Sequence, residues 1–365
     1  MVGPRGATPK LTVAKHQLRD WLDTGIGSLN QNPDPAEVQR SFNLELQHAG
    51  LTCSYDAPPP SSCPDWFQAG YAGRVGVHRD WAFLVVTAGM GIECGYDESA
   101  YVYSWNGEKW VRVWQNEQNN YVNDKYKPQT LQSILISPFN KENDYLVMTL
   151  GSESWCSSNW HDVYYRVFRL GPDQQAPPLI EGSQWSPVGW RNPPIAGSLS
   201  HDDVLVEYLT PSVDSAFLAR EGVYHYKVQQ GGVERVAPFA LSPRDFVDEW
   251  IQTDWLESSK WSEDTNRRAL LNWRTKVDKA KNYLEYIHPT QRCLRGYGLW
   301  QVGLSIEAMP GTEKPQATEA WFLVRWQPPY EFKMVGVSDQ PSADCTEKDP
   351  QADEHGPLFP IQDWR

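Results

Sequence analysis

The sequence contains no long apolar run. The longest apolar stretch near the middle of the first half of the chain is Trp81-Ala-Phe-Leu-Val-Val86, which has the length of a strand. A membrane-spanning helix needs about 18 or more apolar residues in succession. The mean hydropathy is −0.59. We therefore expect no transmembrane segment, and we expect any association with a membrane to be peripheral and to run through a partner.

Basic residues are in the minority. The chain has 33 Lys and Arg against 46 Asp and Glu, a formal net charge of −13. Nucleic-acid binding rests on clustered Lys and Arg, so this balance argues against nucleic acid as a partner. Residues 338–355 contribute −5, from six carboxylates and Lys348. We therefore interpret residues 338–365 as an acidic, Pro-containing C-terminal arm.

The motifs of common enzyme and cofactor sites are absent. The patterns GxSxG, HExxH, Walker A and the EF-hand loop do not occur in the chain. No set of Cys and His residues has the spacing of zinc ligands. The sequence therefore predicts no cofactor and no metal, leaves the catalytic residues unknown, and favours a protein that is not an enzyme.

Tryptophan, in contrast, is abundant. The chain has 18 Trp in 365 residues, although Trp is not among the common residues of ordinary domains. Most of them fall on expected strands or helical stripes, so packing explains most of the excess. Trp155 and Trp160 fall instead on an expected loop, where they are placed to touch a partner.

An internal repeat is the most informative pattern. A shift of 62 residues aligns 83–105 with 145–167 without a gap, with six identities in 23 positions. A shift of 121 gives a weaker third copy near 204–226, and a looser fourth copy runs from Trp300 to Trp326. Each of the clearer copies has an apolar strand, a loop of about a dozen residues and an aromatic-rich strand. The fold class is therefore mainly β, with about four repeated antiparallel units in a propeller-like or meander/sandwich arrangement.

The clearest local prediction is a β-hairpin in the first copy. Strands at 101–105 and 109–114 flank Asn106-Gly107, and Asn-Gly supplies the two positive φ angles of a type I′ turn. Trp110 and Trp114 share a parity with Arg112 between them, which predicts that all three lie on one face.

Helices are expected in two places. An N-terminal helical segment, 1–60, packs on a body of 61–337, and Asp34-Pro35 is a typical helix start with Gly50 as its end. A helical insertion at about 242–287 begins at Ser242-Pro243 and carries the apolar stripe of Phe246 and Trp250. We expect this insertion to cover an edge or one end of the sheets.

The six cysteines indicate an oxidising compartment. Cys53 and Cys63 bracket a Pro-rich loop that a disulfide would close. Cys94 and Cys156 occupy equivalent positions of the repeat, which makes a bridge between neighbouring units plausible, and Cys293 and Cys345 are left for each other. We therefore expect a periplasmic or extracellular protein, with a cytoplasmic one as the alternative. The N-terminus shows no signal peptide, so we expect that a leader was either never present or removed.

Two equivalent loops gather polar and aromatic side chains. They supply the candidate ligand- or partner-binding residues Tyr96, Asp97, Glu98, Glu153, Trp155, Trp160, His161 and Asp162. Acidic groups beside aromatic rings are typical of sugar-binding and sugar-cleaving sites, whereas solvated loop residues are the simpler interpretation.

Three functions fit these observations. The first is a non-enzymatic extracytoplasmic binding or assembly protein with a protein partner, for instance an extrinsic subunit of a larger envelope complex, because interfaces favour Tyr, Trp and Arg. The second is a carbohydrate-active enzyme or lectin that uses the acidic and aromatic loops. The third is a metal-dependent hydrolase that uses His161 and His201.

Overall fold

The computed structural model describes residues 8–51, 73–92, 95–117, 129–139, 144–153, 160–171, 177–187, 194–214, 219–229, 232–236, 240, 242–279, 284–306, 318–327 and 331–348. The chain divides into two compact units. One comprises Met1–Gln184 with Leu199–His201, and the other comprises Trp185–Ser198 with Asp202–Arg365.

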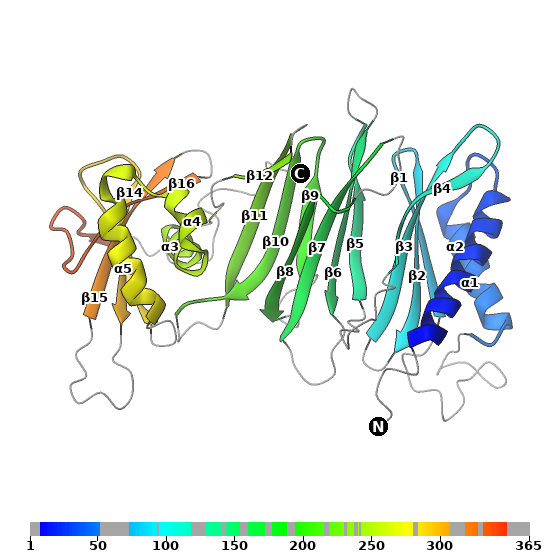
Figure 1. The fold of residues 1–365 in the computed structure, drawn as a ribbon, viewed down its shortest axis with the longest axis horizontal. Coiled ribbons are helices and arrows are strands. Elements are labelled where there is room, and N and C mark those ends of the chain that lie inside the picture. The colour runs from blue at the N-terminus through cyan, green and yellow to red at the C-terminus, as the bar shows by residue number, and fades with distance from the viewer. Residues whose placement is uncertain are drawn as a thin grey trace. The chain divides into compact units, whose positions relative to one another are not determined.

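The described residues of the first unit form two helices and two four-stranded sheets, in which hydrogen-bonded neighbours follow the order of the chain (Figure 1). Its elements are α1 (Thr8–Gly27), α2 (Pro35–His48), β1 (Gly73–Asp80), β2 (Phe83–Ile92), β3 (Gly95–Trp105), β4 (Trp110–Asn116), β5 (Gln129–Ile136), β6 (Tyr145–Glu153), β7 (Trp160–Leu170) and β8 (Ile180–Pro187). The boundary between the units falls within β8.

Helix α2 starts and ends where the sequence predicts. The Asp34 carboxylate accepts the backbone N–H of Ala36 at 2.9 Å, and Pro35 occupies the first turn. At the other end Gly50 has a φ of +68°, the left-handed conformation that ends many helices, and Leu51 N–H returns to Leu46 O at 2.9 Å. The predicted helix boundaries are confirmed.

Two side chains of α2 bind the outer edge of strand β1. The Asn43 amide donates to Val75 O at 2.8 Å and accepts from Val75 N at 3.0 Å. Gln39 accepts from Val77 N at 2.9 Å. Three backbone groups that this edge strand would otherwise expose are therefore satisfied by the helix.

The sheet of β1–β4 is buried on both faces. One face packs on α1 and α2 in a core that includes Leu22, Phe42 and Tyr101. The opposite face packs on the sheet of β5–β8, through residues that include Val85 and Val147. Alternate strand residues point to opposite faces, so the apolar runs of β2 and β3 serve both layers.

The described part of the second unit consists of two further sheets and the helical insertion. Its elements are β9 (Ile195–Leu199), β10 (Asp203–Pro211), β11 (Ala219–Gln229), β12 (Gly232–Arg235), α3 (Pro243–Gln252), α4 (Trp255–Ser258), η3 (Ser259–Trp261), η4 (Asp264–Asn266), α5 (Arg267–Lys279), β13 (Leu284–Arg292), β14 (Leu299–Ile306), β15 (Thr318–Gln327), β16 (Glu331–Ser338) and β17 (Glu347–Lys348). One sheet has the order β12-β11-β10-β9 and the other β16-β15-β14-β13-β17.

The insertion begins as predicted and covers a sheet face. Ser242 caps α3 by accepting Asp245 N–H at 3.0 Å. Phe246 and Trp250 of α3 and Leu270 of α5 share one core with Phe322 of β15. The helices therefore pack on a face of the sheet at the interior strand β15, rather than only along an edge or end. The insertion is also shorter than 242–287, because β13 starts at Leu284.

The structure is mainly β with N-terminal and central helices, as predicted. The apolar strands that the repeat aligns are the second strands of their sheets: β2 begins at Phe83 and β6 at Tyr145, 62 residues apart. The described strands of either unit form separate open sheets, without a closed barrel or propeller.

The hairpin of the first copy is present, but its turn and one face were predicted wrongly. Trp105 pairs with Trp110 across a four-residue loop, in which only Gly107 has a positive φ and the Asn106 side chain accepts two backbone N–H groups. A bulge between Val102 and Tyr103 then shifts the register. Because a one-residue shift reverses the faces, Trp110 packs in the helix-facing core and Trp114 in the sheet-facing core.

No helix in the described part of the chain is both long enough and apolar enough to cross a membrane.

Candidate functional site

The three first-loop candidates lie in a strand rather than in a loop. Strands β2 and β3 pair as far as Ile92 and Gly95, so Tyr96, Asp97 and Glu98 belong to β3. The predicted long loop is wrong here, because the charged residues of this segment are compensated inside the fold. Asp97 and Glu98 are both buried and point to opposite faces of the sheet.

Asp97 is paired with a helix. Its carboxylate lies 2.8 Å from Lys15 Nζ on α1, and both side chains are almost completely buried. Burial lowers the pKa of Lys15, while the nearby Asp97 charge acts in the opposite direction. This pair fixes α1 on the sheet, since an isolated charge at this depth would be very costly.

Glu98 is paired on the other face. Its Oε1 accepts Arg74 Nε at 2.8 Å and its Oε2 accepts the backbone N–H of Leu131 on β5 at 2.6 Å. The Arg74 guanidinium also covers the Tyr96 ring, 3.7 Å from the ring centre. Burial raises the pKa of Glu98, and Arg74 opposes this effect. Glu98 is therefore a structural bridge between the two sheets.

A polar pocket of about 470 Å³ adjoins this bridge. It lies between the edge strands β1 and β5, and α2 contributes to its wall. Its polar lining includes Asn43, Arg74, His78, Thr87, Glu98 and Ser133. Of the residues named as candidates from the sequence, Glu98 is the one that lines this pocket.

The second group of candidates lies at the facing ends of β6 and β7. Glu153 ends β6, and Trp160, His161 and Asp162 begin β7; all four are half-buried. His161 Nδ1 is 2.9 Å from the backbone oxygen of Glu153. Trp155 lies outside the described residues, as do Cys53, Cys63, Cys94 and Cys156.

Tyr164 of β7 is affected by the charges of the first group. Its pKa is raised well above the ordinary value, first by burial and also by the charges of Glu98 and Asp97, against the effect of Arg166. The charges of the β3 carboxylates thus reach Tyr164 of β7, which is not itself one of the candidates predicted from the sequence. Both β3 carboxylates are engaged in ion pairs there, which disfavours a free acid/base pair.

The second unit presents a different candidate, at the loop between β13 and β14. Leu294 is 70 % exposed and Tyr297 80 % exposed, and the Arg295 side chain is 85 % exposed. We call these three residues the exposed tip. Sequence reasoning missed them, although the neighbouring Cys293 and the glycines at 296 and 298 marked a constrained loop.

The loop that carries the exposed tip is held at both ends. Cys293 and Cys345 form a buried disulfide, as predicted. Leu294 N–H donates to Asp344 O at 2.8 Å, which also ties the start of the acidic arm to this unit. Gly298, at φ +65°, accepts Trp326 N–H at 2.7 Å, and the Trp326 ring stacks with Tyr297 at 6.4 Å between centroids.

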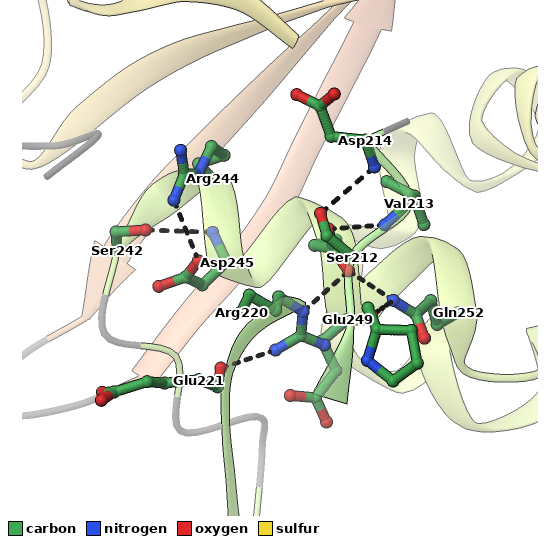
Figure 2. Close-up of polar contacts among 12 residues, drawn as sticks. Ser212, Val213, Asp214, Arg220, Glu221, Ser242, Arg244, Asp245, Glu249 and Gln252 are labelled. Carbon is green, nitrogen blue, oxygen red and sulfur yellow. Dashed lines mark hydrogen bonds and ion pairs between the residues drawn. The ribbon is translucent and has the colours of Figure 1, made fainter. Parts of the chain in front are cut away.

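A buried polar network lies elsewhere in the second unit (Figure 2). Asp248 of α3 accepts from Arg220 Nε at 2.7 Å, from Ser212 Oγ at 2.7 Å and from Val213 N at 3.0 Å. Gln252 donates to the same carboxylate at 2.5 Å. With these partners Asp248 anchors α3 to strand β11 and to the residues that directly follow β10. The sequence gives no sign of it, because Arg220, Ser212 and Val213 are 28, 36 and 35 residues away from Asp248.

Asp245 lies beside this network with fewer partners. Its Oδ1 makes no hydrogen bond to any described residue and lies 3.7 Å from Arg244 Nη2. Burial raises the pKa of Asp245, and the charges of Arg220 and Arg244 oppose the rise. A buried carboxyl of this kind is typical of functional sites and also of structural ion networks.

The described residues contain no group of three or more His, Cys, Asp or Glu side chains that could hold a metal ion. His201, the second histidine of the hydrolase hypothesis, is an exposed turn residue.

Comparison with known proteins adds no relative: no family model matches the chain, and no curated protein is significantly similar to it.

Proposed function

We propose that this chain is a non-enzymatic binding or assembly protein that works outside the cytoplasm and recognises a protein partner through the exposed tip. The observation that carries the proposal is the exposure of Leu294 and Tyr297 on one constrained loop. Large apolar side chains grouped in this way are characteristic of interaction sites.

The chemistry of the tip fits a protein partner. Tyr and Arg are enriched among the residues that dominate binding energies, and they act best at the centre of a desolvated contact. Tyr297 and Leu294 supply apolar area, and Arg295 supplies a guanidinium, with the Asp344 carboxylate 3.6 Å from its Nε. The matching surface would combine an apolar hollow with a carboxylate or backbone carbonyls for Arg295.

The rigidity of the loop supports the same function. A disulfide, backbone hydrogen bonds and the Trp326 ring hold the tip in place before any partner arrives. Less conformational entropy is then lost on association, and preorganised contacts bind more tightly for the same area. The disulfide also favours an oxidising compartment, in keeping with an extrinsic subunit of an envelope complex.

Site-specific photo-crosslinking tests the proposal. A photoreactive phenylalanine analogue at position 297 is expected to join the protein to one discrete partner chain in the cells that produce it. The same analogue at position 256 is the matched control, because Leu256 is 79 % exposed in the same unit. Equal adducts at both positions, or none at 297, would refute the role of the tip.

Substitutions at the tip give a second measurement. L294S combined with Y297S is expected to abolish recovery of the crosslinked partner by affinity purification, whereas L256S leaves it unchanged. Both variants should retain the thermal midpoint of the parent, since exposed side chains away from caps and networks contribute little to stability.

A further inference from the structure

The polar pocket of the first unit carries an inference that goes beyond protein binding. We infer that it binds a small neutral carbohydrate, with Arg74, Thr87 and Ser133 as hydrogen-bonding groups. Its volume of about 470 Å³ lies within the range of small-molecule sites.

The floor of the pocket is kept open by glycine. Residues 74, 76 and 78 of β1 share one face, and Gly76 pairs with Thr87 of β2. A Cβ atom at Gly76 would lie 2.6 Å from Thr87 Oγ1, closer than real contacts allow. The absence of that atom leaves space beside the Thr87 hydroxyl, and both residues line the pocket.

The charges of the pocket cancel. Glu98 is neutralised by Arg74 through the ion pair already described. Burial lowers the pKa of His78, with Asp80 acting against the shift, so its imidazole is uncharged at neutral pH. An anionic ligand would therefore find no uncompensated cation, and a cationic ligand no free carboxylate.

Hydrogen-bonding capacity nevertheless remains. The Arg74 guanidinium uses Nε and Nη2 for Glu98, which leaves Nη1, and the Thr87 and Ser133 hydroxyls make no hydrogen bond to another described residue. The side chain of Gln132 is exposed at the rim. An apolar ligand would leave these groups unpaired at a considerable cost.

A neutral polyhydroxy ring meets all of these conditions. Each sugar hydroxyl donates and accepts, as do Thr87 and Ser133, and none carries charge. The ring would lie over Gly76, within reach of Arg74 at one end and Ser133 at the other. Carbohydrate is thus the ligand class that satisfies the donors and acceptors without an unbalanced charge.

Ligand-observed NMR on the full chain tests this assignment. The probes are glucose, galactose and mannose, with glucuronate as the acidic sugar and glycine as the zwitterion. At least one neutral hexose is expected to bind in the millimolar range, more tightly than glucuronate or glycine. No binding of any hexose, or tighter binding of glucuronate, would overturn the inference.

Variants locate the binding. T87V keeps the shape of the side chain and removes the hydroxyl, so it should weaken hexose binding by about five- to tenfold. G76A fills the floor and should abolish binding, and S133A serves as a second reporter if G76A fails to fold. T24V is the matched control, because Thr24 is an exposed residue of α1 that bonds only to its own helix. Unchanged binding in T87V, G76A and S133A would refute the pocket, and none of these results depends on the exposed tip.

Discussion

The indole N–H of Trp81 donates a hydrogen bond to the backbone oxygen of Ile136 at 3.2 Å. Trp81 belongs to the β1–β2 turn, and Ile136 ends strand β5, so this bond joins the two sheets of the first unit. The Asp80 carboxylate accepts the backbone N–H of Ile136 at 3.0 Å. Trp81 also has a φ of +52°, the one non-glycine positive φ among the described residues, and a bulky residue there is strained.

Two substitutions at Trp81 separate the bond from the strain. W81F should lower the free energy of unfolding by about 1 kcal/mol, because the bond is lost and the strain remains. W81G also loses the bond but relieves the left-handed strain of about 1–2 kcal/mol, so it should be more stable than W81F. Urea unfolding measures both; a glycine variant less stable than the phenylalanine variant would contradict this explanation.

Asp245 should make stability depend on pH. Its pKa is raised by burial above the ordinary value of 3.8, so the folded protein holds the proton more tightly than the unfolded chain, and ionisation at higher pH costs stability. D245N, which stays neutral, should match the parent at about pH 4 and exceed it at about pH 8. Urea midpoints across this interval provide the measurement, and a constant difference between the two proteins would count against the shift.

Removing one partner of the Arg220–Asp248 pair should lower the stability of the protein more than replacing both partners with apolar residues. D248A leaves Arg220 as an uncompensated charge whose side chain is 6 % exposed, and it should cost about 3–5 kcal/mol. The double variant R220M/D248L removes both charges and should recover much of that loss. The same deficit in the single and double variants would show that the anchor is not electrostatic.

The Cys293–Cys345 disulfide closes a loop with a sequence separation of 52. C293S/C345S should therefore lose up to about 4 kcal/mol of stability, because the unfolded chain gains conformational freedom when the loop is no longer closed. Faster amide exchange at Leu294 and Trp326 should accompany the loss. The double serine variant is preferable to a reductant, because the chain has six cysteines. Unchanged exchange at Leu294 would show that the backbone bonds alone fix the exposed tip.

Local signals in the sequence predicted local structure well. The starts of α2 and α3 were confirmed, because Asp34 and Ser242 bond to backbone groups only two or three residues away. The hairpin of β3 and β4 was also confirmed in outline. Its bulge was not foreseen, because it depends on which aromatic residues the two opposing cores accept.

The candidate site was harder to predict, because the burial and the charge pairing of its residues depend on partners that are distant in the sequence. In the sequence Asp97 and Glu98 resemble loop residues. In the fold Asp97 is paired with Lys15, 82 positions away, and Glu98 with Arg74, 24 positions away. Polar residues predict solvent exposure, whereas Asp97 and Glu98 are buried in ion pairs. The disulfide of Cys293 and Cys345 was predicted by elimination, but the sequence did not show that it presents Leu294 and Tyr297.

The contacts of Asn43 and Gln39 with strand β1 have a consequence for self-association. These two amides occupy hydrogen-bonding positions that another copy of the chain could otherwise fill with its own strand. A chain that begins after α2 would offer that row of groups to its neighbours. Loss of the helix would then favour association edge to edge, so we expect α2 also to protect this edge from pairing with another copy of the chain.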